Sequence, residues 1–385
     1  MPLHLQATMR IGIDASLVVG ERAGVGFYTA SLIEAVAALD KQNKYILYPF
    51  FYHIFDPRFK ELTAPAPNFS VRFKALPEAW IRYLWFRSGI PRHWLLGDVD
   101  VLHSTTYCCP RRHAGKLVMT VYDISFLHYP EHHTEANRLH CLKGTLEGAR
   151  WADCIIAISE HTKKDLIEYL NVPDDKIVVT PLAARREFHP RQEAEVRAQV
   201  FKRWGLDAPY LLSVGTLEPR KNIRCLINAF CSLPGEIRDN YHLVIAGGKG
   251  WLNSDIHEAV VEMGVESRIR FLGYVPELDL PWLYCGAACF AYPSLYEGFG
   301  LPPLEAMASG IPVITSNTSS LPEVVGDTGL LVDPRSQEDL RSSLIKVLSD
   351  ADLRREMSEN GLKRATHFSW EKTALETLKV YESVL

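Results

Sequence analysis

Two acidic side chains bracket a glycine-bearing loop in the second half of the chain. Glu297 precedes Gly298 and Gly300, and Glu305 follows within a helix predicted to begin near Pro302. Glycines before a helix let backbone amides approach an anion, and the helix dipole favours negative charge there. Carboxylates instead suit hydroxyl groups, which donate hydrogen bonds. The stretch fits a nucleotide sugar, and it fits equally well an ordinary turn with two solvated glutamates.

Two adjacent cations lie in a second loop, Gly215–Asn222. Arg220 and Lys221 come directly before a predicted helix. Cations are unfavourable at a helix N-terminus unless an anion joins them. Arginine binds a phosphate as a fork and lysine binds it as a point charge, so this pair suits a diphosphate.

A short strand and a helix must position the first loop. The run Ala287–Tyr292 is apolar and of the length typical of a buried strand. Pro302 and Pro303 suit the first turn of a helix, where a backbone amide has no partner. Gly310 is expected to end that helix. The loop therefore connects a strand to a helix, as in a nucleotide-binding α/β domain.

The whole chain shows the same alternation of strands and helices. It has 385 residues, of which 47% are hydrophobic and 23% charged, as expected for a soluble globular protein of about two domains. The polar stretch Arg185–Ala208 marks the predicted boundary. No apolar run of about 18 residues occurs, and Met1–Thr8 lacks the pattern of a secretory signal. The eight cysteines form no Cys-x-x-Cys pair, which favours buried thiols in a reducing cytoplasm.

The first half opens with a strand at Met9–Asp14, a loop with Gly20, Gly24 and Gly26, and a helix from Phe27 onward. This order resembles a Rossmann-like unit, but the glycines do not fit the G-x-G-x-x-G fingerprint. A dinucleotide site is therefore poorly supported. A loop that closes over the phosphates of a substrate stays possible.

Three titratable residues follow predicted strands in the first half: His103, Asp123 and His128. Ligands gather at the carboxyl ends of strands in an open parallel sheet, which places these side chains near a cleft. Each of them also suits a turn or a helix cap.

The segment 79–96 interleaves aromatic and arginine residues, as in segments that lie at a membrane surface. A core helix with its arginines outward explains the pattern as well.

Residues 1–205 carry a net charge of +4 and the remainder −8, so the first half could meet an anionic acceptor or a membrane. No nucleic-acid-binding motif occurs, and no cluster of metal ligands.

Several motifs of the second half occur in the order found in one enzyme family. They are Gly215-Thr-Leu-Glu-Pro-Arg-Lys-Asn222, Ala246-Gly-Gly248, Phe271-Leu-Gly-Tyr-Val275, Glu297-Gly-Phe-Gly-Leu-Pro-Pro-Leu-Glu305, Leu321-Pro-Glu-Val324 and Phe368-Ser-Trp370. The chain thereby resembles the family 4 retaining glycosyltransferases. The resemblance implies the α/β GT-B fold, with two Rossmann-like domains facing a cleft. Residues 1–205 would bind the acceptor, residues 206–366 would bind the donor, and a helix in 367–385 would return to the first domain.

The resemblance also implies roles for individual residues. Arg220 and Lys221 would bind the donor diphosphate, and Glu305 would bind the ribose. Glu297 would bind the donor sugar together with the amides of Phe299, Gly300 and Leu301. The remaining donor-binding positions would be the loop glycines and the border of the base: Gly26, Gly215, Gly273, Tyr274 and Val275.

One departure from the family concerns the acceptor side. Many members carry His-Asp where this chain has Tyr122-Asp123, so Asp123, His103 or His128 is expected to assist there. We expect a metal-independent hexosyltransferase without a cofactor. The motif Gly215–Asn222 is similar to that of bacterial mannosyltransferases of lipopolysaccharide assembly, which favours GDP-mannose as donor and a saccharide or lipid-linked acceptor.

The resemblance leaves other functions open. A GT-B epimerase or phosphorylase would share the scaffold, and a non-catalytic nucleotide-sugar-binding protein would share the donor site. The expected location is the cytoplasm, either free or peripheral on the inner face of the membrane.

Overall fold

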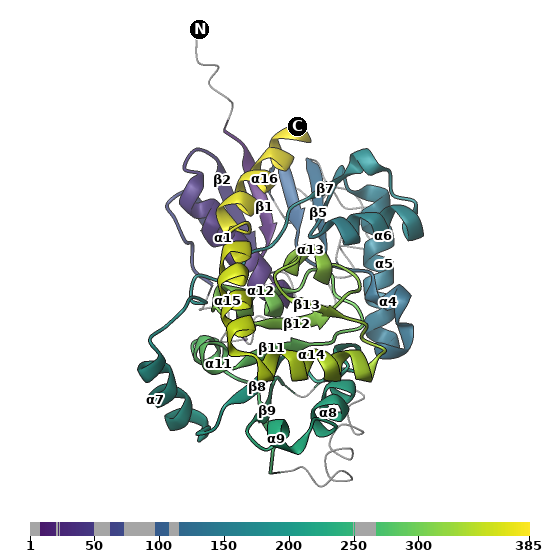
Figure 1. Cartoon of the computed structure of the whole chain (residues 1–385). Helices are drawn as coiled ribbons and strands as arrows, with labels where there is room; N and C mark the ends of the chain where they lie inside the picture. Colours follow the sequence, from purple (N-terminus) through teal and green to yellow (C-terminus); the bar gives the residue numbers. More distant parts are fainter. Residues whose placement is uncertain are drawn as a thin grey trace. The chain divides into compact units, whose positions relative to one another are not determined.

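The computed structural model of the chain is shown in Figure 1, and its structure is described for residues 8–20, 22, 24–49, 62–72, 97–107, 115–248, 250 and 267–385. The chain forms two compact units. The first unit comprises Met1–Ile124, Glu135–Leu182 and Trp370–Leu385. The second unit comprises Ser125–Thr134 and Ala183–Ser369.

The first unit is built on a parallel sheet with the strand order β3-β2-β1-β4-β5-β6-β7. Its strands are β1 (Arg10–Asp14), β2 (Lys44–Tyr48), β3 (Phe69–Val71), β4 (Val101–Ser104), β5 (Lys116–Val121), β6 (Cys154–Ala157) and β7 (Ile177–Val179). Its helices are α1 (Gly24–Leu39), α5 (Glu135–Trp151), α6 (Glu160–Leu170) and α16 (Trp370–Ser383), with a 3-10 turn η3 (Asp174–Lys176). The strand order reverses between β1 and β4, as in Rossmann-like sheets.

Helix α16 completes the core of the first unit, although it comes from the end of the chain. It packs against α1, and the two helices, yellow and purple, lie together in Figure 1. The ring of Tyr28 on α1 lies 6.2 Å from that of Trp370 on α16. Tyr381 on α16 is fully buried. Burial of such aromatic side chains contributes a large hydrophobic free energy.

The second unit has a parallel sheet with the order β10-β9-β8-β11-β12-β13. Its strands are β8 (Tyr210–Val214), β9 (His242–Ala246), β10 (Ile269–Gly273), β11 (Cys289–Tyr292), β12 (Val313–Ser316) and β13 (Leu330–Val332). Its helices are α4 (Ser125–His128), α7 (Glu193–Trp204), α8 (Ile223–Cys231), α9 (Gly235–Arg238), α11 (Leu280–Gly286), α12 (Leu301–Ala308), α13 (Leu321–Val325), α14 (Gln337–Ser349) and α15 (Ala351–Ala365), with 3-10 turns η2 (Pro130–His132) and η4 (Pro219–Lys221).

The core of the second unit lies between its sheet and the helices α8 and α14. Leu211 and Ile245 from the strands pack with Phe230 of α8 and Leu344 of α14. The apolar runs predicted as buried strands are buried on both faces, as expected for a parallel sheet covered by helices. This core fixes the ends of β8 and β11, from which the loops with the candidate functional residues emerge.

The predicted boundary at residues 205/206 needs two corrections. First, the linker with helix α7 belongs to the second unit, because α7 packs against α11 and Arg191 stacks over Trp282 at 4.2 Å. Second, Ser125–Thr134 groups with the second unit, whereas its neighbours on both sides belong to the first. The predicted aromatic and basic segment 79–96 lies outside the described residues.

Candidate functional site

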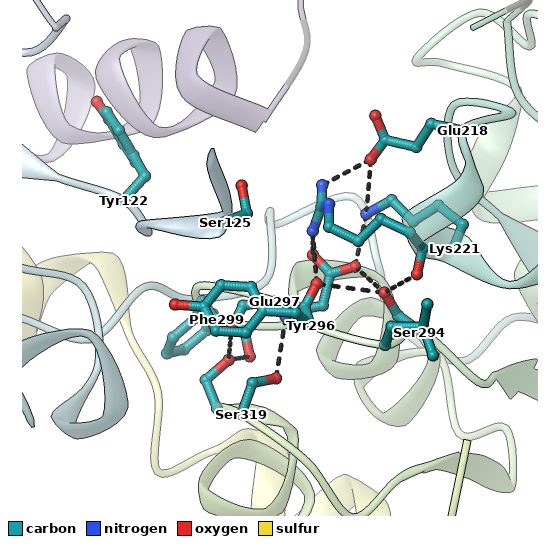
Figure 2. Close-up of polar contacts among 12 residues, drawn as sticks. Tyr122, Ser125, Glu218, Lys221, Ser294, Tyr296, Glu297, Phe299 and Ser319 are labelled. Atoms are coloured by element: carbon teal, nitrogen blue, oxygen red, sulfur yellow. Dashed lines mark hydrogen bonds and ion pairs between the residues drawn. The ribbon is translucent and has the colours of Figure 1, made fainter. Parts of the chain in front are cut away.

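The candidate site lies where the strand order of the second sheet reverses. Strands β8 and β11 are neighbours there, although β9 and β10 come between them in sequence. The loop after β8 carries Arg220 and Lys221, and the loop after β11 carries Glu297. Ligands of open α/β sheets bind at such a point, outside the carboxyl ends of the strands. Figure 2 shows side chains of both loops converging there.

Four charged side chains alternate in sign at this point. Lys221 Nζ donates to Glu297 Oε1 (2.6 Å), and Arg220 Nη1 lies 3.0 Å from Glu297 Oε2. Arg220 Nη2 donates to Glu218 Oε1 (2.6 Å). We call these four residues the charge cluster. Both cations are thereby oriented before any ligand arrives.

The carboxylate of Glu297 is the centre of this cluster. Tyr292 Oη and Ser294 Oγ also donate to its Oε1, at 2.8 and 2.6 Å. Burial alone would raise the pKa of Glu297, but Arg220 and Lys221 outweigh it and lower the pKa to about 2. Glu297 is therefore ionised at neutral pH, and its oxygens are largely engaged by protein donors.

The backbone of the glycine loop is fixed from the loop after β12. Ser320 Oγ bonds to the carbonyl oxygens of Glu297 (2.8 Å) and Phe299 (2.7 Å), and Ser319 Oγ accepts from the amide of Glu297 (2.9 Å). Gly300 has a φ of +119°, and a Cβ there would lie 2.9 Å from a methyl carbon of Leu321. Only glycine fits this position without strain.

Helix α12 begins beside the charge cluster. Gly300 is its N-cap residue, and no side chain caps the helix. Leu301 and Pro302 follow in the first turn, which contains no acidic residue. The first amides of a helix have no intrahelical partner, and the dipole there is positive. The geometry suits an anion placed between this helix start and Arg220.

Glu305 lies one turn further along α12, in a different environment. Its Oε1 accepts a hydrogen bond from Arg185 Nε (3.0 Å), and Arg185 Nη2 lies 3.0 Å from the same oxygen. Burial raises the pKa of Glu305, and Arg185 offsets this only in part. Burial, together with the Glu305 charge, also raises the pKa of Tyr284 well above its usual value. This carboxylate is less saturated by protein donors than that of Glu297.

The predicted border of the base lies at the end of β10. Gly273 has a φ of +68°, and its carbonyl accepts from the amide of Gly247 (2.8 Å). Tyr274 is about half exposed at 48%, whereas Val275 is buried. Gly215 directly follows β8 and its amide donates to the carbonyl of Ala246 (2.9 Å).

Known proteins match both halves of the chain. The family description "Glycosyl transferases group 1" matches residues 197–364, and "Glycosyltransferase Family 4" matches residues 23–185. The chain is a family 4 glycosyltransferase.

Individual relatives agree with this assignment. The glycosyltransferase is 40% identical over 292 residues to O-antigen chain mannosyltransferase B of Escherichia coli, covering 75% of this chain and 76% of that protein. It is 35% identical over 229 residues to the serotype-specific mannosyltransferase WbdA of Escherichia coli, covering 58% of this chain and 28% of that protein. Sucrose-phosphate synthase from Thermosynechococcus elongatus shares its fold, with a TM-score of 0.77 at 24% identity over 98% of this chain and 99% of that one. The predicted GT-B fold class is confirmed.

The structure corrects the prediction for His103. This side chain is fully buried in the first unit of the glycosyltransferase, and its ring nitrogens pair with Tyr381 Oη (2.7 Å) and Thr120 Oγ1 (2.8 Å). Burial lowers the pKa of His103 to about 3. A neutral core histidine with both nitrogens engaged is not available to an acceptor.

The other predicted residues of the first half lie in separate places. Asp123 follows β5 at the carboxyl edge of the first sheet, and its backbone carbonyl accepts from Tyr107 Oη (3.4 Å). Gly26 lies within the first turn of α1, where a Cβ would be 2.4 Å from the carbonyl oxygen of Leu17. His128 belongs to α4 in the second unit, where its ring lies 4.9 Å from that of Tyr296. Tyr122, at the position of the family histidine, is buried and donates to the carbonyl of Thr105 (2.7 Å).

Sequence reasoning missed the residues that support the charge cluster. Tyr292 and Ser294 bind its lysine or its central carboxylate, while Ser319 and Ser320 fix the loop backbone, and Glu218 within the cluster was missed as well. A usable signal was present, because polar residues at or shortly after the ends of β8, β11 and β12 must gather at one edge of the sheet. Arg185 gave no such signal, since its partner lies 120 residues away.

No helix among the described residues is long and apolar enough to cross a membrane. The same residues also contain no group of three or more His, Cys, Asp or Glu side chains arranged to bind a metal.

Proposed function

We propose that this glycosyltransferase moves mannose from GDP-mannose, with retention of configuration, to a saccharide or lipid-linked acceptor in cell-surface polysaccharide assembly. The relative with 40% identity is named as a mannosyltransferase of the O-antigen chain, and WbdA is also named as a mannosyltransferase. These names support mannose as the sugar and a polysaccharide as the product.

The charge cluster is the observation that carries the proposal. Lys221 is buried and Arg220 is half-buried, and Glu297, in the loop that leads into α12, pairs with both of them. Positive groups that are fixed before the reaction cost no reorganisation when negative charge develops. In the proposed complex, the donor diphosphate lies between these cations and the amides of Phe299, Gly300 and Leu301.

The reaction then depends on stabilisation of the leaving group. The bond between the anomeric carbon and the diphosphate oxygen breaks, and the acceptor oxygen forms the new bond to that carbon. Charge grows on the departing diphosphate, where Arg220, Lys221 and the helix start stabilise it. The acceptor hydroxyl gives its proton to the departing phosphate oxygen. We propose that these groups make a metal ion and a cofactor unnecessary.

The remaining positions complete the proposed donor site. Glu305 accepts hydrogen bonds from the ribose, and Gly273–Val275 borders the base. Glu297 contributes mainly by orienting the cations, with the donor sugar as a further partner. Gly26, in the first unit, is proposed to contribute to donor binding, and Asp123, also in the first unit, is proposed to act on the acceptor side. His128 is proposed to act from the second unit, next to Tyr296.

We also propose a cytoplasmic location, with contact to the inner face of the membrane if the acceptor is lipid-linked. The excess of positive charge in residues 1–205 supports contact with an anionic surface. Cosedimentation with anionic and neutral vesicles would test the membrane contact, and equal recovery in both would contradict it.

A donor screen tests the main proposal. Thermal unfolding is measured with GDP, UDP and ADP, and transfer is measured with GDP-mannose and UDP-glucose in the presence of membrane saccharide extracts. We expect GDP to give the largest stabilisation, because bound ligand stabilises the folded state by mass action. Transfer from UDP-glucose alone would overturn the choice of GDP-mannose, and binding of no nucleotide would overturn the donor site.

A further inference from the structure

Arg185 connects two parts of the second unit that the donor site needs. It lies in the linker after β7, and its side chain is only 13% exposed. Its Nε and Nη2 both contact Glu305 on α12, and its Nη1 lies 3.8 Å from Glu277 Oε2, in the segment after β10. Its guanidinium also stacks over Phe188 at 4.7 Å. Such packing fixes the orientation of an arginine side chain.

The geometry of the Arg185 contact constrains the Glu305 carboxylate. Arg185 Nε donates to Oε1 and Nη2 lies 3.0 Å from the same oxygen, so these two contacts of Arg185 leave Oε2 to other donors. Burial disfavours the ionised form of Glu305. A charged partner counteracts this and keeps an acceptor oxygen in a fixed direction.

The second contact reaches the segment that borders the proposed base site. Glu277 comes two residues after Val275, and its side chain is 32% exposed. Arg185 is therefore bonded to the proposed ribose acid and lies near the proposed base border. No motif of the sequence relates this linker residue to either of them.

We propose that Arg185 is a positioning residue for the nucleoside half of the donor, presenting Glu305 Oε2 to the ribose hydroxyls and restraining the segment at Gly273–Glu277. This inference rests on the proposed nucleotide-sugar donor site. It assigns specificity for ribose to a residue that does not itself contact the reacting atoms.

Calorimetric titration with matched nucleotides tests the inference. Wild type, Arg185→Met and Arg185→Lys are titrated with GDP, with UDP and with the 2′,3′-dideoxy form of the tighter binder. Arg191→Met is the matched control, because Arg191 lies in the same linker but stacks over Trp282. Circular dichroism confirms that each variant is folded.

We expect wild type to bind the ribonucleotide about tenfold or more tightly than the dideoxy form, since hydrogen bonds to a charged group are strong. Arg185→Met should lose most of this preference while keeping its affinity for the dideoxy form. Arg185→Lys should lie between the two, because lysine supplies the charge without the fork. Arg191→Met should retain the wild-type preference.

The outcomes separate this inference from the proposed function. An Arg185→Met variant that retains the full preference would overturn the inference, as would one that loses equal affinity for both nucleotides. If wild type binds no nucleotide, the proposed donor site is wrong. If wild type binds the ribonucleotide and the dideoxy form equally, Glu305 does not bind the ribose hydroxyls. The proposed role of Arg185 is then overturned as well.

Discussion

Glu297 and Glu305 lie on one loop and helix, and both are buried, yet their surroundings differ in charge. Glu297 is near two cations and accepts from two hydroxyl groups, whereas Glu305 pairs mainly with Arg185. The pKa of Glu297 falls to about 2, and that of Glu305 rises. The comparison indicates different roles for the two acids. Glu297 orients Arg220 and Lys221, whereas Glu305 retains hydrogen-bonding capacity for a ligand.

Removing the charge of Glu297 is expected to have the largest effect. Glu297→Gln leaves the buried Lys221 and the half-buried Arg220 with less charge compensation, which should cost about 3–5 kcal/mol of unfolding free energy. Guanidinium unfolding measures this loss. A stability within about 1 kcal/mol of wild type would mean that Glu297 does not organise the cluster.

Loss of Arg220 separates catalysis from stability. Arg220→Ala should lower kcat/KM by about a hundredfold or more, because it removes charge from the leaving diphosphate. Arg355→Ala, which removes an exposed arginine paired with Asp352, is the control and should leave the rate unchanged. Wild-type turnover by Arg220→Ala would contradict the proposed mechanism.

Low pH should selectively reduce the contribution of Glu297 to the free energy of unfolding. Its folded pKa lies below the ordinary value of 4.5, so its stabilisation is present above about pH 4.5 and is lost as pH falls towards about 2. The free-energy difference between wild type and Glu297→Gln should include about 3 kcal/mol that disappears over this range. A difference that does not change with pH would show that ionisation of Glu297 is not the cause.

Glu305→Gln should weaken nucleotide binding more than it lowers stability. The neutral side chain is easily accommodated, so the stability loss should be about 1 kcal/mol. Binding of GDP should weaken about tenfold, because a charged acceptor for the ribose is lost. Calorimetry and thermal unfolding together check both parts. A stability loss as large as that of Glu297→Gln would remove the distinction between the two acids.

The smallest effect is expected for Tyr292→Phe. The hydroxyl of Tyr292 donates to Glu297 and accepts from Lys221, but the ion pair between these two residues would persist. We expect a loss of about 1 kcal/mol, measured by guanidinium unfolding. A loss near that of Glu297→Gln would make the hydroxyl, and not the ion pair, the main contact.

Local signals predicted much of the secondary structure of the second unit. The two sheets follow from apolar runs of strand length, and the start of α12 follows from Gly300, Pro302 and Pro303. Arg220 and Lys221 were identified because two cations before a helix need an anion. These signals depend on neighbours in sequence, which is why they could be read without a structure.

Long-range pairing could not be predicted in the same way. The sequence pattern placed His103 near a cleft at the end of a strand, but α16 covers this side chain with Tyr381, which lies 278 residues further along the chain. Arg185 appeared to belong to a polar linker, although its charge is paired on α12. The grouping of Ser125–Thr134 with the second unit likewise depends on tertiary packing, such as the contact between His128 and Tyr296.

The position of α16 sets an order for folding during synthesis. Tyr381 and Trp370 are synthesised only after the whole second unit. Until then, His103 cannot bond to Tyr381 and Tyr28 cannot pack against Trp370. The second unit has its own hydrophobic core and can fold earlier. A nascent chain stalled after residue 369 should therefore resist protease in the second unit first, reversing the usual order in which N-terminal domains mature before later ones.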